Sequence, residues 1–220
     1  MVFMPVFRQK KLMREYKFIF WDFDGVIKES VNVKTMAYYS LFEKYGHDIA
    51  SKVKAHHLEN GGISRYEKIP IYLEWSGIIP NKDLVCQLCE EFSKLVCRQV
   101  IDSPWVPGVK KYLFNNSFKQ KFILVSATPQ KEIEFILSEL KLTNCFLNIY
   151  GSPMNKEEAI FETIAKYNLQ KNDCLMIGDA TSDLEAANKN NIDFLFRKHE
   201  FNIKIFKEYN LDYISDFDSL

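Results

Sequence analysis

Two acidic side chains follow a short aromatic run near the start of the chain. The segment Trp21-Asp22-Phe23-Asp24-Gly25 places two carboxylates two residues apart, and residues at that spacing in an extended segment point to the same side. Gly25 lets the backbone turn closely around whatever the carboxylates hold. Carboxylates this close repel each other unless a cation or a proton lies between them. The pair therefore indicates a site that binds a divalent metal ion.

Further polar side chains follow the later apolar runs of the chain. Ser126 comes directly after the second run, and Lys156 opens a helix-like stretch beyond the third. Asp179 follows the fourth run, with Asp183 four residues further on. Ligands of open parallel sheets bind beyond the carboxyl ends of the strands. We therefore expect these side chains to share one site with the first acidic pair.

The donor atoms of these side chains indicate which metal ion would bind and which reaction the site could catalyse. Oxygen ligands in small number favour Mg²⁺ that keeps several waters, whereas a zinc site would require Cys or His. A carboxylate such as Asp22 can attack phosphorus and form an aspartyl phosphate, which splits one difficult displacement into two easier ones. The metal bridges that carboxylate and the phosphoryl group and offsets their repulsion. The set therefore predicts magnesium-dependent phosphoryl transfer.

Each remaining side chain has an expected role in that reaction. Asp24 protonates the leaving oxygen and later deprotonates the attacking water, as a general acid and base. Ser126 and the backbone amides that follow it donate hydrogen bonds to the phosphoryl oxygens, while Lys156 supplies a positive charge. Asp183 orients either Lys156 or a metal-bound water.

The elements that position these residues alternate along the chain. The expected strands are residues 18–21, 122–125, 146–150, 174–177 and 192–196, and the expected helices of the same part are residues 130–140, 156–167, 184–189 and 203–209. The run Phe-Ile-Phe-Trp at 18–21 is continuously apolar, as expected of a central parallel strand buried on both faces. The alternation predicts an α/β fold with a Rossmann-like parallel sheet.

Between the first two strands lies a long stretch without a convincing buried strand. Its clearest helical patterns are residues 31–45, 66–75 and 83–100, with Pro70 expected to kink or restart the second. The exit, Ser103-Pro104-Trp105-Val106-Pro107-Gly108, reads as a rigid turn-rich link. We expect a helical cap at residues 30–108 that hinges on an α/β core formed by residues 1–29 and 109–220.

The ordered set of motifs resembles the haloacid dehalogenase superfamily over the whole chain. The motifs that carry the resemblance are Asp22-Phe23-Asp24-Gly25-Val26-Ile27, Ser126, Lys156 and Gly178-Asp179-Ala180-Thr181-Ser182-Asp183. The inserted helices resemble the α-helical cap of the branch that contains phosphoglycolate phosphatase and β-phosphoglucomutase. The resemblance implies Mg²⁺ held by the Asp22 side chain, the Asp24 backbone carbonyl and Asp179.

The sequence departs from the family pattern at two positions. Lys156 lies five residues after Gly151, where many members of the family place the lysine directly after the glycine. Position 29 is Glu, where Asp is usual.

A second candidate group lies within the insert. Gly62 is followed by a polar helix opening that contains Arg65 and Lys68. Free amides at a helix N-terminus, together with these cations, could bind an anionic substrate group as the cap closes. The alternative interpretation is an ordinary loop and helix start with solvated charges. His47, His56 and His57 lack partners at ligand spacing, so we interpret them as surface or packing residues.

The amino-acid composition disfavours nucleic-acid-binding, membrane and secreted proteins. The 29 basic and 29 acidic residues balance, so no net charge favours nucleic acid or an anionic membrane. The first 17 residues are too charged for a signal sequence, and no window approaches the ~18 apolar residues of a membrane span. Five scattered cysteines favour reduced thiols. We expect a cytoplasmic enzyme acting on a small phosphorylated metabolite, with no expectation about its oligomeric state.

Three functions are compatible with these residues. Hydrolysis of a small phosphate monoester is the leading hypothesis, and a phosphomutase of the β-phosphoglucomutase type would use the same aspartates. A catalytically silent binding or regulatory protein would keep the fold but lose the motifs, which are intact here. A dehalogenase or a phosphonate-cleaving enzyme is disfavoured because those branches usually lack the second aspartate, present here as Asp24.

Overall fold

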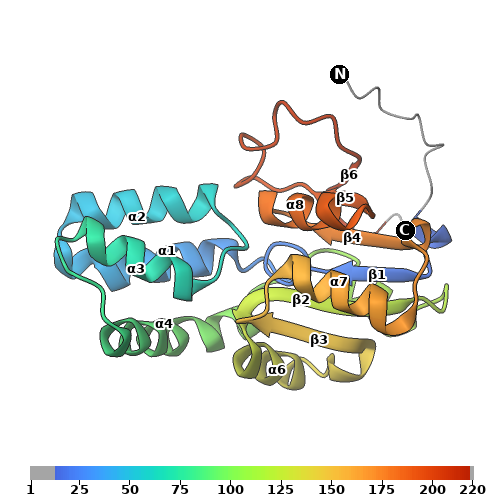
Figure 1. The fold of residues 1–220 in the computed structure, drawn as a ribbon, viewed down its shortest axis with the longest axis horizontal. Coiled ribbons are helices and arrows are strands. Elements are labelled where there is room, and N and C mark those ends of the chain that lie inside the picture. Colours follow the sequence, from blue (N-terminus) through green and yellow to red (C-terminus); the bar gives the residue numbers. More distant parts are fainter. Residues whose placement is uncertain (1–12, 219–220) are drawn as a thin grey trace.

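The structure, a computed structural model, describes residues 13–218. It contains one six-stranded parallel sheet with strand order β3-β2-β1-β4-β5-β6 (Figure 1). The strands are β1 (Phe18–Trp21), β2 (Lys121–Pro129), β3 (Phe146–Ser152), β4 (Cys174–Gly178), β5 (Asp193–Arg197) and β6 (Tyr213–Ile214). Five of the six were expected, and the α/β class with a parallel sheet is confirmed. The two-residue β6 is too short to leave a sequence pattern.

The first strand is central because it is apolar on both faces. Phe20 faces one side of the sheet and packs with residues of α7 and α8, whereas Ile19 and Trp21 face the other side, which α5 and α6 cover. The helices of this part are α5 (Val109–Asn115), α6 (Gln130–Glu139), α7 (Lys156–Tyr167) and α8 (Thr181–Asn190). The sheet therefore lies between two helical layers.

Strand register brings the polar strand ends to one edge. Trp21 lies opposite Leu124 of β2 and opposite Ile177 of β4. The N–H of Asp22 donates to the Ile177 carbonyl at 3.0 Å, so the pairing continues up to the first acidic residue. The residue after β1, the middle of β2 around Ser126 and the end of β4 are thus level with one another.

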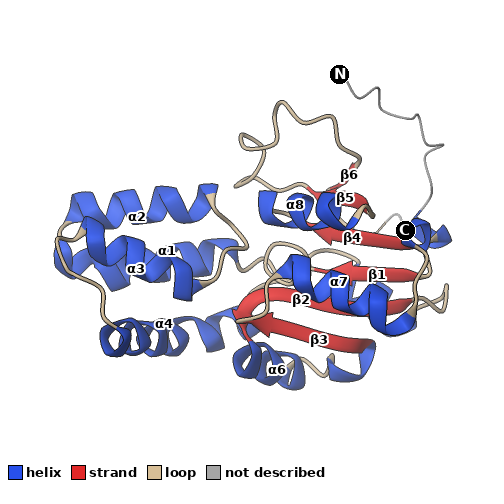
Figure 2. Cartoon of the chain, viewed as in Figure 1, coloured by secondary structure: helices blue, strands red, loops and turns tan. Residues whose placement is uncertain are grey.

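The long insert between β1 and β2 forms a separate helical group beyond this edge (Figure 2). Its helices are α1 (Val31–Phe42), α2 (His47–Glu59), α3 (Arg65–Trp75) and α4 (Lys82–Asp102). α3 runs unbroken through Pro70, so no restart occurs there. α2 was not among the clearest helical patterns, because its buried face consists of Ala50, Val53 and His57, which give a weak apolar pattern.

The expected helix at residues 203–209 is wrong. This segment is a series of turns, in which the N–H groups of Ile205 and Phe206 bond back to the Asn202 carbonyl. The segment is instead shaped by tertiary contacts, because the Asn202 side chain bonds to distant backbone and Phe206 stacks on Phe196 at 4.2 Å.

The expectations about a signal segment and about a membrane span concern different parts of the chain. The sequence inference about a signal segment at residues 1–17 falls mostly on residues 1–12, which lie outside the described part. Within residues 13–218, none of the helices combines the length and the apolar character needed to cross a bilayer.

Candidate active site

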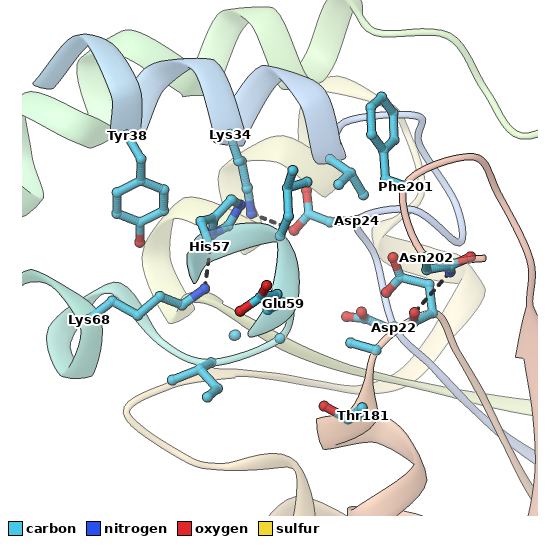
Figure 3. A pocket seen from close by; sticks show the side chains of 18 of the residues that line it. Asp22, Asp24, Lys34, Tyr38, His57, Glu59, Lys68, Thr181, Phe201 and Asn202 are labelled. Carbon is cyan, nitrogen blue, oxygen red and sulfur yellow. Dashed lines mark hydrogen bonds and ion pairs between the residues drawn. The ribbon is translucent and has the colours of Figure 1, made fainter. Parts of the chain in front are cut away.

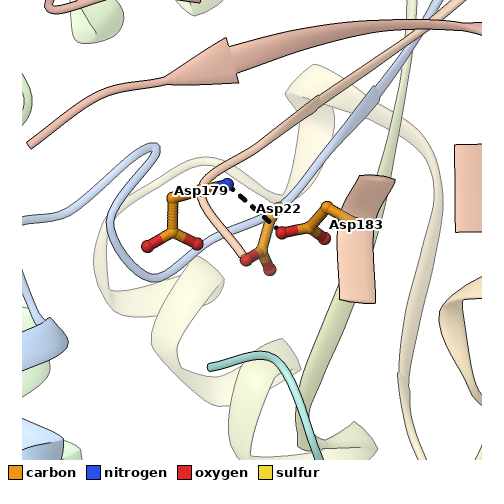
Figure 4. Close-up of side chains that lie close together, drawn as sticks. All are labelled: Asp22, Asp179 and Asp183. Atoms are coloured by element: carbon orange, nitrogen blue, oxygen red, sulfur yellow. Dashed lines mark hydrogen bonds between the residues drawn. The ribbon is translucent and has the colours of Figure 1, made fainter. Parts of the chain in front are cut away.

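Three carboxylates meet where β1 and β4 end (Figure 4). The ligand oxygens of Asp22, Asp179 and Asp183 lie within 4.8 Å of one another. Asp183 sits in the first turn of α8, where its Oδ2 accepts hydrogen bonds from the N–H groups of Asp179 at 3.2 Å and Ala180 at 3.0 Å. A carboxylate in the first turn that bonds back to the residue before the helix stabilises the helix start. The same contacts therefore begin α8 and place the carboxylate at the site.

Lys156 joins two of these carboxylates. Its Nζ lies 3.0 Å from Oδ2 of Asp22 and donates to Oδ1 of Asp183 at 2.5 Å. Lys156 is the first residue of α7, whose start is capped by the Asn155 side chain accepting from the Glu158 N–H at 2.8 Å. The structure thus brings Lys156 and Asp183 together, as expected, even though the lysine lies further from Gly151 than in the family pattern.

The cluster carries an excess of negative charge. Three carboxylates against one ammonium leave two negative charges, and the side chains are at most 10% exposed. Burial, followed by the Asp183 and Asp179 charges, raises the pKa of Asp22 well above its ordinary value, although Lys156 opposes the shift. A divalent cation bound by the carboxylate oxygens would neutralise the cluster. The charge and the donor atoms both fit Mg²⁺.

Asp24 faces away from this cluster, toward the cap. Its carboxylate accepts hydrogen bonds from Ser30 Oγ at 2.6 Å and from Lys34 Nζ, and Lys34 also donates to Thr128 Oγ1 at 2.7 Å. Burial alone would raise the pKa of Asp24, but Lys34 and Ser30 outweigh burial and hold it below its ordinary value. Gly25, at φ +74°, follows it, and a Cβ there would meet Asp179 Oδ2 at 2.2 Å. Only glycine therefore fits this turn against the carboxylate cluster.

Ser126 was expected directly after a strand that ends at residue 125, but β2 continues to Pro129, so Ser126 lies within the strand and is 2% exposed. Its Oγ accepts a hydrogen bond from the Thr128 N–H at 3.2 Å. Ser126 and Lys156 line one side of a hollow between core and cap, with Gly62 on the opposite side. Ser126 thus lies at the same edge as the acidic residues.

The cap contributes cations to a cavity above the aspartates (Figure 3). Lys68, 1% exposed, donates to His57 Nδ1 at 2.9 Å and to the Asn60 carbonyl at 2.7 Å. Burial, then the charges of Lys34 and Lys156, lowers the pKa of Lys68 to about 7. Burial and Lys68 lower the pKa of His57 well below its ordinary value. His57, interpreted from the sequence as a surface or packing residue, therefore also lines the cavity as a neutral partner of Lys68.

The glycine loop of the cap docks directly on the core. Gly62 has φ +75°, and a Cβ there would lie 2.1 Å from Ser182 Oγ and 3.1 Å from Lys156 Nζ. Next to it, Ser64 Oγ and Ser152 Oγ are hydrogen bonded at 2.8 Å. Only glycine permits this approach, so the loop closes the site over Lys156.

Arg65 lines the cavity, and its guanidinium is also bound by the core. Its guanidinium forms a two-point ion pair with Glu132 of α6 at 2.7 and 2.9 Å and donates to Ser93 of α4 at 2.6 Å. Both charged side chains are less than 10% exposed. The structure therefore uses Arg65 to join the cap to the core.

Four residues at the site were not found from the sequence. Thr128 lies two residues after Ser126, and Lys34 one helical turn after Ser30, so both spacings were available as signals. His199 and Asn202 follow β5. Their place after a strand was the only signal for them in the sequence. His199 Nε2 lies 2.8 Å from Asp179 Oδ2.

Several solved structures share this fold. A β-phosphoglucomutase from Clostridium difficile is 24% identical, with 93% of each chain covered and a TM-score of 0.73. A protein described as a predicted phosphoglycolate phosphatase, from Haemophilus somnus, is 18% identical, with 93% of this chain and 96% of that chain covered and a TM-score of 0.72. A protein described as a predicted phosphatase, from Clostridium acetobutylicum, is 19% identical, with 90% and 93% covered and a TM-score of 0.70.

No curated protein matches the chain. The family described as haloacid dehalogenase-like hydrolase matches residues 19–196, which include both acidic strand ends, the whole helical insert and Lys156. These residues make up most of the chain, and the match confirms the resemblance inferred from the motifs. The chain belongs to the haloacid dehalogenase-like hydrolase family.

Proposed function

We propose that this protein is a magnesium-dependent phosphatase that hydrolyses a small phosphate monoester through a phosphoryl group carried on Asp22. The main support for the proposal is the geometry around the Asp22 carboxylate. Asp22 is buried at a strand end, contacts the Lys156 ammonium at 3.0 Å, and lies beside two further carboxylates. Such a carboxylate is held in one orientation, as a nucleophile must be.

The first half of the reaction forms the covalent intermediate. An Asp22 oxygen attacks phosphorus, and the bond from phosphorus to the leaving oxygen breaks. Asp24, which Lys34 and Ser30 keep ionised in the free protein, must take up a proton as substrate binds and then gives that proton to the leaving oxygen. Ser126 and the amides after it donate to the phosphoryl oxygens. Lys156 offsets the negative charge between Asp22 and the phosphoryl group.

The second half releases phosphate. Asp24, now ionised, takes a proton from water, and the water oxygen attacks phosphorus and breaks the bond to Asp22. The Lys34 ammonium and the Ser30 hydroxyl, both bonded to the Asp24 carboxylate, favour its ionised form. One side chain thereby serves as acid and then as base.

Mg²⁺ would be held by the Asp22 side chain, the Asp24 backbone carbonyl and Asp179. When bound, it supplies positive charge that neutralises the carboxylate cluster and the phosphoryl group. Asp183 accepts from Lys156 and from two backbone N–H groups, so its role is to hold Lys156 in place.

The cap sets the size and charge of the substrate. The cavity between Lys68 and the aspartates has a volume of about 70 Å³, which suits a small leaving group. Lys68 has no carboxylate partner among the ion pairs of the described residues, and it faces this cavity. We assign it to an anionic or strongly polar part of the substrate. A phosphomutase would use the same lysine for a second phosphate.

The connections between cap and core support movement of residues 30–108 as one unit on a core of residues 1–29 and 109–220. The two connecting segments pair with each other, because the Glu29 N–H donates to the Pro104 carbonyl at 2.9 Å and the Val106 N–H to the Ile27 carbonyl at 3.1 Å. Because the two connections are paired, they would act as one hinge. Opening about this hinge would let the cytoplasmic substrate enter and phosphate leave.

The test is phosphate release from a panel of small phosphomonoesters, with and without Mg²⁺. We expect release that depends on Mg²⁺ and falls at least about 1,000-fold in Asp22→Asn, which keeps the shape but removes the nucleophile. Asp48→Asn, an exposed aspartate of the cap, is the matched control. Turnover unaffected by Asp22→Asn would contradict the proposal, and conversion of a sugar phosphate without free phosphate would identify a mutase.

A further inference from the structure

The chain returns over the site after its fifth strand. Beyond β5, His199 lies with its Nε2 2.8 Å from Oδ2 of Asp179, and both side chains are at most 10% exposed. His199, Phe201 and Asn202 line the same cavity as the cap cations. None of the catalytic roles assigned above uses this contact.

Hydrogen bonding identifies which ring nitrogen of His199 carries the hydrogen. The Phe201 backbone N–H donates to Nδ1 at 3.3 Å, so Nδ1 is an acceptor. In a neutral imidazole the other nitrogen is then the donor. Nε2–H therefore donates to the Asp179 carboxylate. A nitrogen that carries hydrogen does not bind a metal, so His199 acts on the aspartate and not as a ligand.

The backbone of Asp179 is held from the same side. Asn202 Nδ2 donates to the Asp179 carbonyl and to the Arg197 carbonyl, each at 2.9 Å. Asn202 Oδ1 in turn accepts from the His199 N–H at 2.9 Å. This network fixes His199 relative to Asp179, because one amide side chain bonds to the backbone of both residues.

We propose that His199 is a positioning residue that holds the Asp179 carboxylate in the orientation needed to bind Mg²⁺. The proposal rests on the proposed function for the identity of the metal. A carboxylate fixed by a hydrogen bond keeps one oxygen directed away from its donor and loses little rotational freedom on binding a cation. Outer partners of metal ligands commonly change metal affinity by roughly 10- to 100-fold when they are removed.

Direct titration of Mg²⁺ into the full chain, by calorimetry and without substrate, tests the proposal. We expect His199→Ala and His199→Phe to weaken Mg²⁺ binding by about 10-fold or more. His199→Gln keeps a donor N–H at similar reach and should restore most of the affinity. His47→Ala, which removes a histidine that contacts only Tyr39 among the hydrogen bonds of the described residues, is the control.

A second measurement separates positioning from folding. Thermal unfolding in EDTA should give similar midpoints for wild type and His199→Gln. If His199→Ala does not fold, His199→Phe replaces it in the test, because it keeps a ring of similar size. In turnover, the Mg²⁺ concentration for half-maximal rate should rise in His199→Phe, while kcat at saturating Mg²⁺ changes much less.

The proposal is overturned if both His199→Ala and His199→Phe bind Mg²⁺ as wild type does, if His199→Gln binds as weakly as they do, or if wild type binds no Mg²⁺. The first two outcomes are distinct from failure of the proposed function, whereas the third would also remove its Mg²⁺ dependence. Mg²⁺ affinity that depends on His199, in a protein that releases no phosphate from any ester, would remove the phosphatase assignment and leave the positioning role in place.

Discussion

The core wall and the cap wall of the cavity carry opposite charges and are held in different ways. The core wall is acidic, and its carboxylates Asp22, Asp179 and Asp183 lie within 4.8 Å of one another. The cap wall is basic, with Lys34 and Lys68 facing the same cavity. Asp22 and Asp179 stand at strand ends, where sheet register sets their spacing, and Asp183 stands in the first turn of α8. The cap cations stand on helices and reach the core only through side-chain contacts.

This difference indicates how the site is completed. The acidic wall is positioned within the core, because the backbones of β1 and β4 pair directly. The basic wall depends on contacts across the interface, namely Lys34 with Asp24 and Arg65 with Glu132. Under the proposed function, a phosphate ester would be enclosed by opposite charges only when cap and core are in contact. Variants on each wall should accordingly have different consequences.

The largest effect on the stability of the core wall is expected for Lys156→Met. The change leaves Asp22 and Asp183 without their shared cation in a buried site. We expect a loss of about 4 kcal/mol in the free energy of unfolding in EDTA. Mg²⁺ should restore part of it by supplying positive charge and by binding the native state. Urea unfolding with EDTA and with Mg²⁺ measures both values.

Lys189→Met is the control for this experiment. Lys189 pairs with Glu157 at 2.6 Å on the surface, so its loss should change stability little. A Lys156→Met protein as stable as wild type in EDTA would show that the acidic wall does not need this cation.

The contact between the walls should be broken by Arg65→Met or by Glu132→Met alone. Each change leaves one buried charge without its partner, and we expect a loss of about 3 kcal/mol in unfolding free energy. The double variant should recover much of this loss, because it removes both charges. A double-mutant cycle from urea unfolding measures the coupling. Additive losses would contradict a direct interaction between cap and core.

The smallest effect, a pH-dependent change in KM, is expected for substitution of Lys68. Because the pKa of Lys68 is lowered to about 7, its ammonium is charged below pH 7 and becomes neutral above it. The KM of wild type for an anionic substrate should therefore rise as the pH increases through 7. Lys68→Met should raise KM at pH 6 by about 10-fold, the loss of one charged hydrogen bond, and should remove this dependence.

Comparison of KM for wild type and Lys68→Met between pH 6 and pH 8.5 isolates this lysine, since titration of the substrate affects both proteins equally. Lys52→Met, an exposed lysine of the cap, should follow wild type. A ratio of the two KM values that stays constant with pH would exclude Lys68 from substrate binding.

Local patterns in the chain were sufficient for most of the core wall. A continuous apolar run predicts a buried strand, and residues directly after such runs in β1, β2 and β4 must reach one sheet edge because parallel strands share direction. Asp22, Asp24, Ser126 and Asp179 were located in this way. Lys156 and Asp183 were located by their place at the start of helices. Apolar strand runs and helix starts are short-range patterns of residue type, so sequence could specify them.

The partners of side chains depended on the tertiary structure. Arg65, expected to contact substrate, lines the cavity and also pairs with Glu132, which is 67 residues away, a partner that the sequence did not indicate. Residues 203–209 have a helical pattern, yet form turns because Asn202 and Phe206 are held by distant groups. His199 meets Asp179 only because the chain folds back after β5.

The amino-acid sequence was therefore enough to specify the family, the parallel sheet, the helical insert and the acidic strand ends. Only the folded chain decided which cations face the cavity, which of them join cap to core, and that His199 holds Asp179. The physical reason is the range of the interactions. Strand and helix patterns arise from neighbouring residues, whereas ion pairs, burial and the resulting pKa values arise from groups that come together only when the chain has packed.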